Sequence, residues 1–159
     1  EFGGYAFPNK WRLPMVETSG PNKGMTLNIN QNRVWWRLAD IYLLRAECRS
    51  RLGGEYIAGA IDDLNEIRER SKAKLYDASE YAGDLRYAIF KEREKELIME
   101  GQRYYDIIRN GYVRTELEGG FRTLTDQDLI DGALFCMISK KAFSQNPLLR
   151  QNTYWHNRK

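Results

Sequence analysis

Residues 34–70 read VWWRLADIYLLRAECRSRLGGEYIAGAIDDLNEIRER, and this stretch decides the fold. Its first part, 34–52, is apolar over most of a helix circumference, which is typical of a helix buried on several sides. Gly53 and Gly54 then mark a helix end. From Ile57 to Ile67 apolar residues recur at i, i+3, i+4, i+7 and i+10, which predicts a second helix over 56–70. Because the link is short, we expect an antiparallel helical hairpin.

The pattern extends beyond the hairpin. Residues 71–83 form a polar connector, and Asp84 or a neighbour caps a third helix over 84–100. Gly101 interrupts it, and a short helix is expected to follow as far as Asn110.

The two ends of the chain are less regular. Glycine and proline punctuate residues 1–33, where 26–30 alternates like a short strand. A short helix is expected near 126–131. We therefore expect one mainly α domain, with a loop-rich lead-in (1–33), a helical part (34–111) and an irregular C-terminal segment (112–159).

Composition excludes several classes of function. The 159 residues carry 25 Lys+Arg and 22 Asp+Glu, a net charge of +3, which suits one domain and requires no anionic partner. No apolar run approaches the roughly 18 residues that a membrane span needs. His156 is the only histidine, which disfavours a His-based triad or a His-rich zinc site. Cys48 and Cys136 predict two free thiols, with Cys48 packed inside the first helix.

A dense charged segment offers two interpretations. Glu92, Glu96 and Glu100 are four residues apart, so they line one helix face, and Arg103 and Arg109 are placed to fold back onto them. One interpretation is a carboxylate pair for glycoside hydrolysis. The other, which we favour, is a structural ion-pair network, because neighbouring arginines lower a carboxyl pKa whereas a catalytic acid needs a raised one.

The first predicted helix also carries charges. Arg37, Asp40, Arg45 and Glu47 lie in a segment too apolar for a surface helix, so some of them must be paired, because unpaired buried charge is costly. We expect their partners on the second helix. These are Arg68 and Arg70.

Aromatic residues offer the only hint of a ligand site. Trp11, Trp35, Trp36 and Trp155 could stack on sugar rings, although large aromatics also fill cores, and the first three are the candidates for a ligand site. Nucleic-acid binding is disfavoured, since the basic residues within 91–96 alternate with glutamates and cancel their field. The sequence contains no motif for a phosphate loop, a dinucleotide, a zinc protease or a serine hydrolase.

Four stretches, in order, resemble the C-terminal region of the SusD/RagB family of outer-membrane nutrient-binding lipoproteins. RLADIYLLRAE (37–47) is similar to R-x-A-D/E-x-x-L-x-x-A-E, and LNEIRER (64–70) to L-N-x-I/V-R-x-R. EREKELIMEGQRYYDIIR (92–109) is similar to E-R-x-x-E-L-x-x-E-G-x-R-x-x-D-x-x-R, and NPLLRQN (146–152) to N-P-x-L-x-Q-N. The charged and amide residues of these motifs resemble scaffold rather than ligand contacts: Arg37, Asp40, Glu47, Asn65, Arg68, Arg70, Glu92, Arg93, Glu96, Glu100, Arg103, Asp106 and Arg109.

The resemblance implies a mainly α fold of helix pairs like tetratricopeptide units. It implies no catalysis and no cofactor or metal. It also implies a protein on the cell-surface side of the outer membrane, which binds a glycan or another nutrient and passes it to a SusC-like TonB-dependent transporter. The lipid anchor and most of the ligand site are expected in an N-terminal part that these residues do not include. The alternative is a scaffold of helix pairs that binds a protein and has no small-ligand site of its own.

Overall fold

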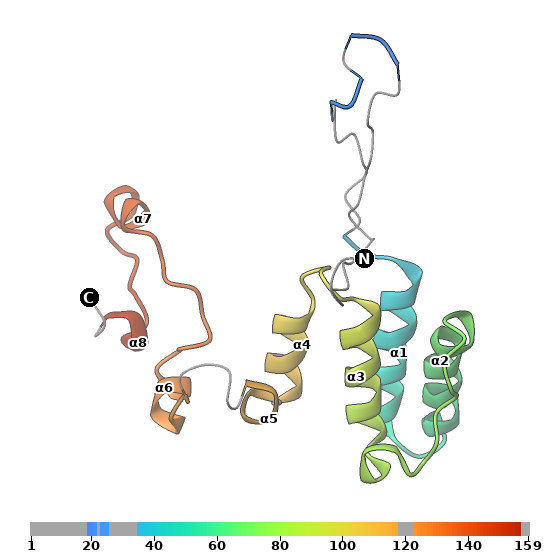
Figure 1. Ribbon diagram of the computed structural model, residues 1–159. Helices are drawn as coiled ribbons and strands as arrows, with labels where there is room; N and C mark the ends of the chain where they lie inside the picture. The colour runs from blue at the N-terminus through green and yellow to red at the C-terminus, as the bar shows by residue number, and fades with distance from the viewer. Residues whose placement is uncertain (1–18, 22, 26–34, 118–122, 157–159) are drawn as a thin grey trace. The chain divides into compact units, whose positions relative to one another are not determined.

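The computed structural model describes residues 19–21, 23–25, 35–117 and 123–156 (Figure 1). This described part is helical without strands, which confirms the mainly α class. The chain divides into two compact units, 1–103 and 104–159. Trp11 and the expected strand at 26–30 lie outside the described residues. The finer division of the domain at 33/34 and 111/112 stays a prediction.

The first unit is built on the expected hairpin. Helix α1 spans Leu38–Leu52 and helix α2 spans Tyr56–Arg70. Gly53 ends α1 with a positive φ of 70°, a conformation that favours glycine, and its N–H donates to the Arg49 carbonyl at 3.1 Å. The first helix therefore begins four residues later than the sequence pattern predicts and ends where the glycines place its end.

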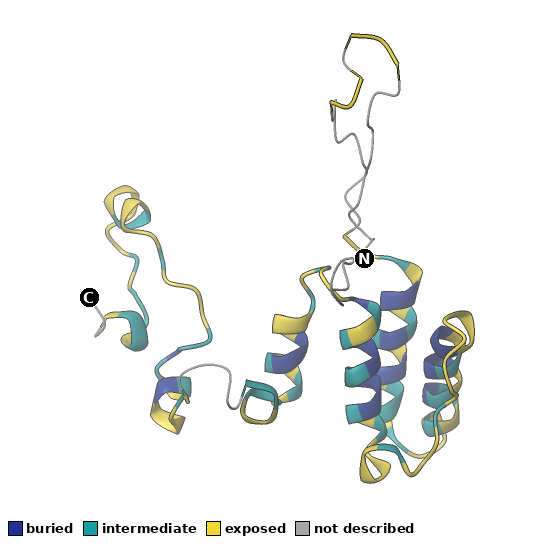
Figure 2. Ribbon diagram, viewed as in Figure 1, coloured by how far each residue is buried: buried dark blue, intermediate teal, exposed yellow. Residues whose placement is uncertain are grey.

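Helix α3, Leu85–Glu96, packs against α1, so that α1 lies between α2 and α3 (Figure 1). Asp84 caps it as expected, because its side chain accepts the Tyr87 N–H at 3.0 Å. Figure 2 shows the buried residues on the facing sides of these helices. The core cluster consists of Ala39, Leu43 and Ala46 from α1, Leu64 and Ile67 from α2, and Ala88 and Ile89 from α3.

The third helix is shorter than the sequence pattern predicts. It ends at Glu96, and a turn follows in which Met99 has a φ of 63° and Gly101 a φ of 82°. The helix therefore ends before Glu100, and the left-handed conformations at Met99 and Gly101 prevent it from continuing. The expected face of three glutamates on one helix is therefore wrong, because only Glu92 and Glu96 belong to α3.

Helix α1 keeps one apolar side exposed. Its neighbours α2 and α3 do not cover Leu38, Ile41, Cys48 and Leu52, which recur at helical spacing and which we call the α1 stripe. Cys48 is thus an exposed free thiol, and the expectation that it packs inside the helix bundle is wrong. Cys136 is also free, as expected.

Short helices make up the rest of the described chain. Between α2 and α3 a turn, η1, spans Glu80–Gly83. Helix α6 confirms the short helix expected near residue 126, and a capping box between Thr125 and Asp128 holds its first turn. The remaining helices are α4 (Arg103–Asn110), α5 (Val113–Leu117), α6 (Asp126–Ile130), α7 (Lys140–Gln145) and α8 (Thr153–His156).

Candidate functional site

The acidic residues after position 90 are bound by arginines from other helices. Arg37, just before α1, binds both Glu96 and Glu100. Its Nε donates to Glu100 Oε2 at 2.9 Å and its Nη2 to Glu100 Oε1 at 2.8 Å, a bidentate pair. Arg70, at the end of α2, contacts the second carboxylate oxygen of Glu96 at 2.5 Å. Glu96 and Glu100 therefore hold the start of α1 and the end of α2 against α3.

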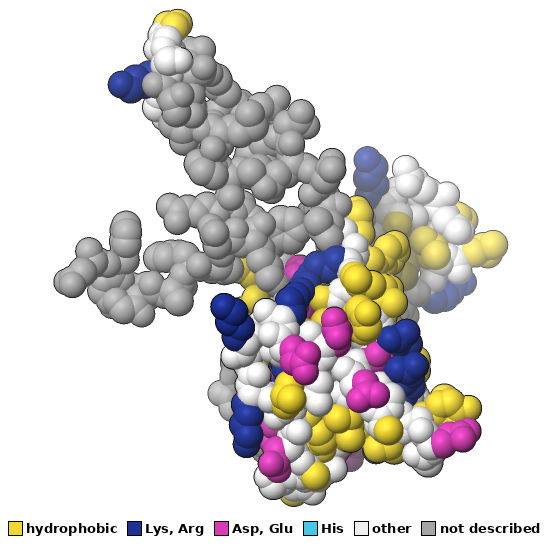
Figure 3. Space-filling view, turned by 90° about the vertical axis from the view of Figure 1, so that its right-hand side faces the viewer, with side chains coloured by type: hydrophobic (Ala, Val, Ile, Leu, Met, Phe, Trp, Pro, Cys, Tyr) yellow, Lys and Arg dark blue, Asp and Glu magenta, His cyan; other side chains and the backbone are white. Residues whose placement is uncertain are grey.

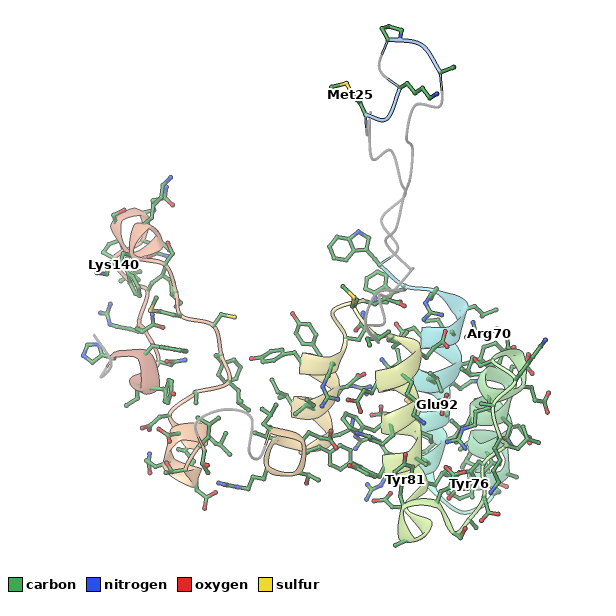
Figure 4. All side chains as sticks on the ribbon, viewed as in Figure 1. Met25, Arg70, Tyr76, Tyr81, Glu92 and Lys140 are labelled. Atoms are coloured by element: carbon green, nitrogen blue, oxygen red, sulfur yellow. The ribbon has the colours of Figure 1, made fainter. Side chains whose placement is uncertain are left out.

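Arg68 forms a second set of ion pairs between elements of the first unit. Its buried side chain donates from Nε to Glu92 Oε2 at 3.0 Å, and from Nη1 and Nη2 to the two oxygens of Glu80 at 2.9 and 3.1 Å. Figure 4 labels Glu92 on α3 and Arg70 on α2. One guanidinium thus ties α2 to α3 and to the turn η1.

Three further ion pairs hold α1 to its neighbours. Arg93 of α3 contacts Asp40 of α1 at 2.7 Å, and both side chains are buried. Asp63 of α2 receives Arg45 at 2.6 Å and Arg49 at 2.7 Å, both from α1. The buried face of the hairpin is therefore ionic as well as apolar.

Several of the expected charge partners are wrong. Arg103 binds Glu94 and Arg109 binds Asp106. Glu92, Glu96 and Glu100 are bound by Arg68, Arg70 and Arg37. Likewise Arg68 and Arg70 pair with residues of α3 and η1. The physical reason is geometry: the turn after Glu96 ends the face that Arg103 was expected to meet, and α1 presents Asp40 toward α3 but Arg45 and Arg49 toward α2.

The remaining motif residues also hold structure. Glu47 pairs with Arg51 one turn along α1, at 3.1 Å. Asn65 accepts the Tyr76 N–H at 2.8 Å and so fixes the connector that follows α2. Near the C-terminus, the Gln151 amide bonds both backbone groups of Ile138, and Asn152 donates to the Gly132 carbonyl at 3.0 Å.

The electrostatics of the cluster do not suit acid catalysis. Burial raises the pKa of Glu96, but the hydrogen bonds from Arg70 and Arg37 outweigh it and leave the pKa below the usual value. Hydrogen bonding to Arg68 likewise lowers the pKa of Glu80. A general acid needs the opposite shift. The cluster is therefore built to stay ionised, which stabilises the packing of three helices.

This arrangement predicts acid sensitivity. Because the folded-state pKa of Glu96 lies below its ordinary 4.5, its contribution to stability is present above pH 4.5 and is lost as the pH falls through the folded value. We expect Glu96→Gln to lower the free energy of unfolding at pH 7 and to flatten its dependence on pH below 4.5. Urea unfolding at pH 7 and at pH 3.5 measures both effects. Glu66→Gln, at an exposed position of α2, is the control, and an equal effect of both variants would contradict the assignment.

The aromatic candidates lie just before α1. Trp35 and Trp36 are 67% and 73% exposed, so their rings are accessible. Trp11 lies outside the described residues. On the face drawn in Figure 3, Lys/Arg and Asp/Glu side chains are interspersed among apolar ones. Within the described ranges no group of three His, Cys, Asp or Glu side chains is suited to hold a metal ion.

Sequence reasoning missed some partners in the network. Asp63 and Glu80 were not singled out, yet they bind three of the arginines. Asp63 directly precedes Leu64, a buried apolar residue of the predicted second helix. This position next to the core could have identified Asp63 from the sequence. Glu80 lies in a polar connector, and its pattern carries no such signal.

The fold and the site define a helix-pair scaffold held by buried ion pairs. Residues 4–155 match the model of the SusD family. The chain is 41% identical over 87 residues to SusD-like protein P25 of Formosa agariphila, covering 53% of this chain and 16% of that protein. It is 30% identical over 129 residues to SusD-like protein P38 of the same organism, covering 76% of this chain and 24% of that protein. The chain belongs to the SusD family.

The matches cover a small part of these relatives. The chain spans 16% and 24% of the length of the two curated proteins. No solved structure matches the chain at a significant level. Among the described residues, no helix combines the length and the apolar character needed to cross a membrane.

Proposed function

We propose that this chain is part of a non-catalytic binding protein at the outer surface of the outer membrane. It captures a glycan or another small nutrient and passes it to a SusC-like TonB-dependent transporter. The observation that carries the proposal is membership of the SusD family. Ion pairing of the carboxylates supports the absence of catalysis, because the pKa shifts of Glu96, a motif residue, and of Glu80 are downward. Attachment to the membrane is through an N-terminal lipid anchor.

Trp35 and Trp36 are the proposed contribution of this segment to glycan binding. Both indoles are exposed, and they precede a helix whose position the Arg37 ion pairs fix. An aromatic plane presented from a rigid element can stack on the apolar face of a sugar ring at low entropic cost.

Titration with soluble glycans tests this role. We expect saturable quenching of tryptophan fluorescence by one glycan class, and a loss of affinity of at least about tenfold in Trp36→Ala, as for truncation of an aromatic anchor. Far-UV circular dichroism on the same samples verifies folding. Tyr56→Ala, which removes an exposed aromatic side chain of α2, is the matched control. An unchanged affinity in both Trp35→Ala and Trp36→Ala would exclude this pair from the site.

The α1 stripe favours a second candidate function. Leu38, Ile41 and Leu52 are large, exposed and aligned, which is typical of a helix face that another protein covers. In this alternative the segment is a scaffold that binds the transporter and has no small-ligand site. It predicts saturable binding to a SusC-like transporter that Ile41→Lys weakens, and no response to any glycan.

A further inference from the structure

A pocket of about 670 Å³ lies in the C-terminal unit, within residues 137–156. Its volume falls in the range of small-molecule sites. The apolar part of its wall comes from Met137, Ile138, Phe143, Leu149 and Trp155. The segment 137–151, which carries helix α7, meets α8 here, and the family motif 146–152 supplies part of the wall.

Hydrogen bonds hold the wall of the pocket in place. Trp155 Nε1 donates to the Phe135 carbonyl at 2.6 Å, which fixes the indole, and Tyr154 meets the indole edge-to-face with centroids 4.9 Å apart. The side-chain amide of Gln151 forms hydrogen bonds with the backbone of Ile138, at 3.2 and 3.4 Å. The aromatic surface is therefore pre-organised, which lowers the entropic cost of binding a ring against it.

The polar part of the lining is basic. It consists of Lys140, Arg150 and His156 together with Gln151, and no acidic side chain of the described residues lines the pocket. Figure 4 shows Lys140 at the start of α7. Arg150 uses Nη1 to bond the Pro147 and Leu149 carbonyls, at 2.9 and 3.0 Å, which holds its guanidinium at the pocket.

This combination selects a ligand that carries negative charge. Lys140 and Arg150 line the pocket and keep exposed side chains, so they place two positive charges at its edge. An anionic group near the ammonium and guanidinium makes charge-assisted hydrogen bonds, which a neutral ligand lacks. The rigid indole and Phe143 meanwhile offer apolar contact to a ring.

We propose that this pocket is a subsite for an acidic sugar, a saccharide ring that bears a carboxylate or a sulfate. The inference rests on the proposed function, since it names the substrate class of a glycan-binding protein. The ring lies against Trp155 and Phe143, and the anionic group lies between Lys140 and Arg150. This subsite lies on residues other than the Trp35–Trp36 pair.

Calorimetric titration of the 159-residue chain with galactotriose, trigalacturonate and sulfated galactotriose tests the proposal. We expect at least one acidic trisaccharide to bind about tenfold more tightly than galactotriose, the size of effect that one charge-assisted hydrogen bond supplies. Comparison of the affinities of the two acidic sugars shows whether the pocket prefers a carboxylate or a sulfate. The difference should shrink at high ionic strength.

Neighbouring lysines provide the matched control. Lys140→Met keeps the aliphatic stem and removes the charge that lines the pocket, so the preference for the acidic sugar is expected to disappear. Lys141→Met removes an equal charge from the next residue of α7, which does not line the pocket, and should leave the preference intact. Equal losses in both variants would show that only the general positive charge acts, and would overturn the subsite.

The outcomes separate this inference from the proposed function. Equal binding of neutral and acidic trisaccharides overturns the acidic subsite and leaves glycan binding standing. Acidic binding that Lys140→Met abolishes supports both. No binding of any trisaccharide by a helical, folded chain counts against the subsite and against glycan binding by this segment together.

Discussion

Replacement of Arg93 by methionine is expected to lower the free energy of unfolding by about 3–5 kcal/mol, the range for breaking a buried ion pair. The Arg93 side chain is 1% exposed, and its Nη1 lies 2.7 Å from Asp40 Oδ1 and 3.3 Å from the Asp40 carbonyl. Methionine retains much of the apolar stem but leaves the Asp40 carboxylate buried without this cation. Urea unfolding followed by far-UV circular dichroism measures the loss.

Two controls define this result. Lys95→Met, at an exposed position of the same helix, should change stability by less than about 0.5 kcal/mol. The double variant Asp40→Leu with Arg93→Met removes both charges and should recover much of the lost stability, because well-packed apolar groups can replace a buried pair. A loss below about 1 kcal/mol in Arg93→Met would contradict a major role of this pair.

Replacement of Arg68 by methionine is the second large effect, expected at about 3 kcal/mol or more. This buried guanidinium binds Glu92 and Glu80 together, so its loss leaves the buried Glu92 carboxylate with the more distant Lys95, at 3.8 Å, and releases the turn η1. The connector after α2 should also open, since Arg68 Nη1 donates to the Lys74 carbonyl at 3.4 Å. Faster hydrogen exchange at the Tyr76 amide, which is bonded to Asn65, reports that opening.

Arg45→Met is the matched control for Arg68. Arg45 also binds a buried carboxylate, but it is exposed, and Asp63 keeps its second partner Arg49. We expect a loss of no more than about 1 kcal/mol and unchanged exchange at Tyr76. If Arg45→Met and Arg68→Met had equal effects, burial and shared partners would not explain the role of Arg68.

The sequence pattern predicted the helices of the first unit because their signals are local. The spacing from Ile57 to Ile67 predicts α2, the Gly53–Gly54 pair the end of α1, and Asp84 the start of α3. Periodicity and capping act over one to three turns, so they can be read from neighbouring residues. The four motif stretches likewise predicted the family that the comparisons show.

The pairing of charges could not be read in this way. Sequence spacing placed Arg103 near Glu96 and Glu100, whereas Arg37, 59 and 63 residues away, binds both of them. Which guanidinium reaches a carboxylate depends on how α1 packs on α3 and on the turn at Gly101. The exposure of Cys48 has the same origin, because α1 is apolar almost all round and only packing decides which side is covered.

The sequence by itself therefore determined the class of the fold, the helical hairpin and the family. Tertiary structure alone decided the ion-pair partners, the uncovered α1 stripe and the basic pocket between α7 and α8. The physical reason is the sequence separation of the residues in contact. A helix is specified by contacts three or four residues apart, whereas an ion pair across helices or a pocket wall depends on distances that no local pattern encodes.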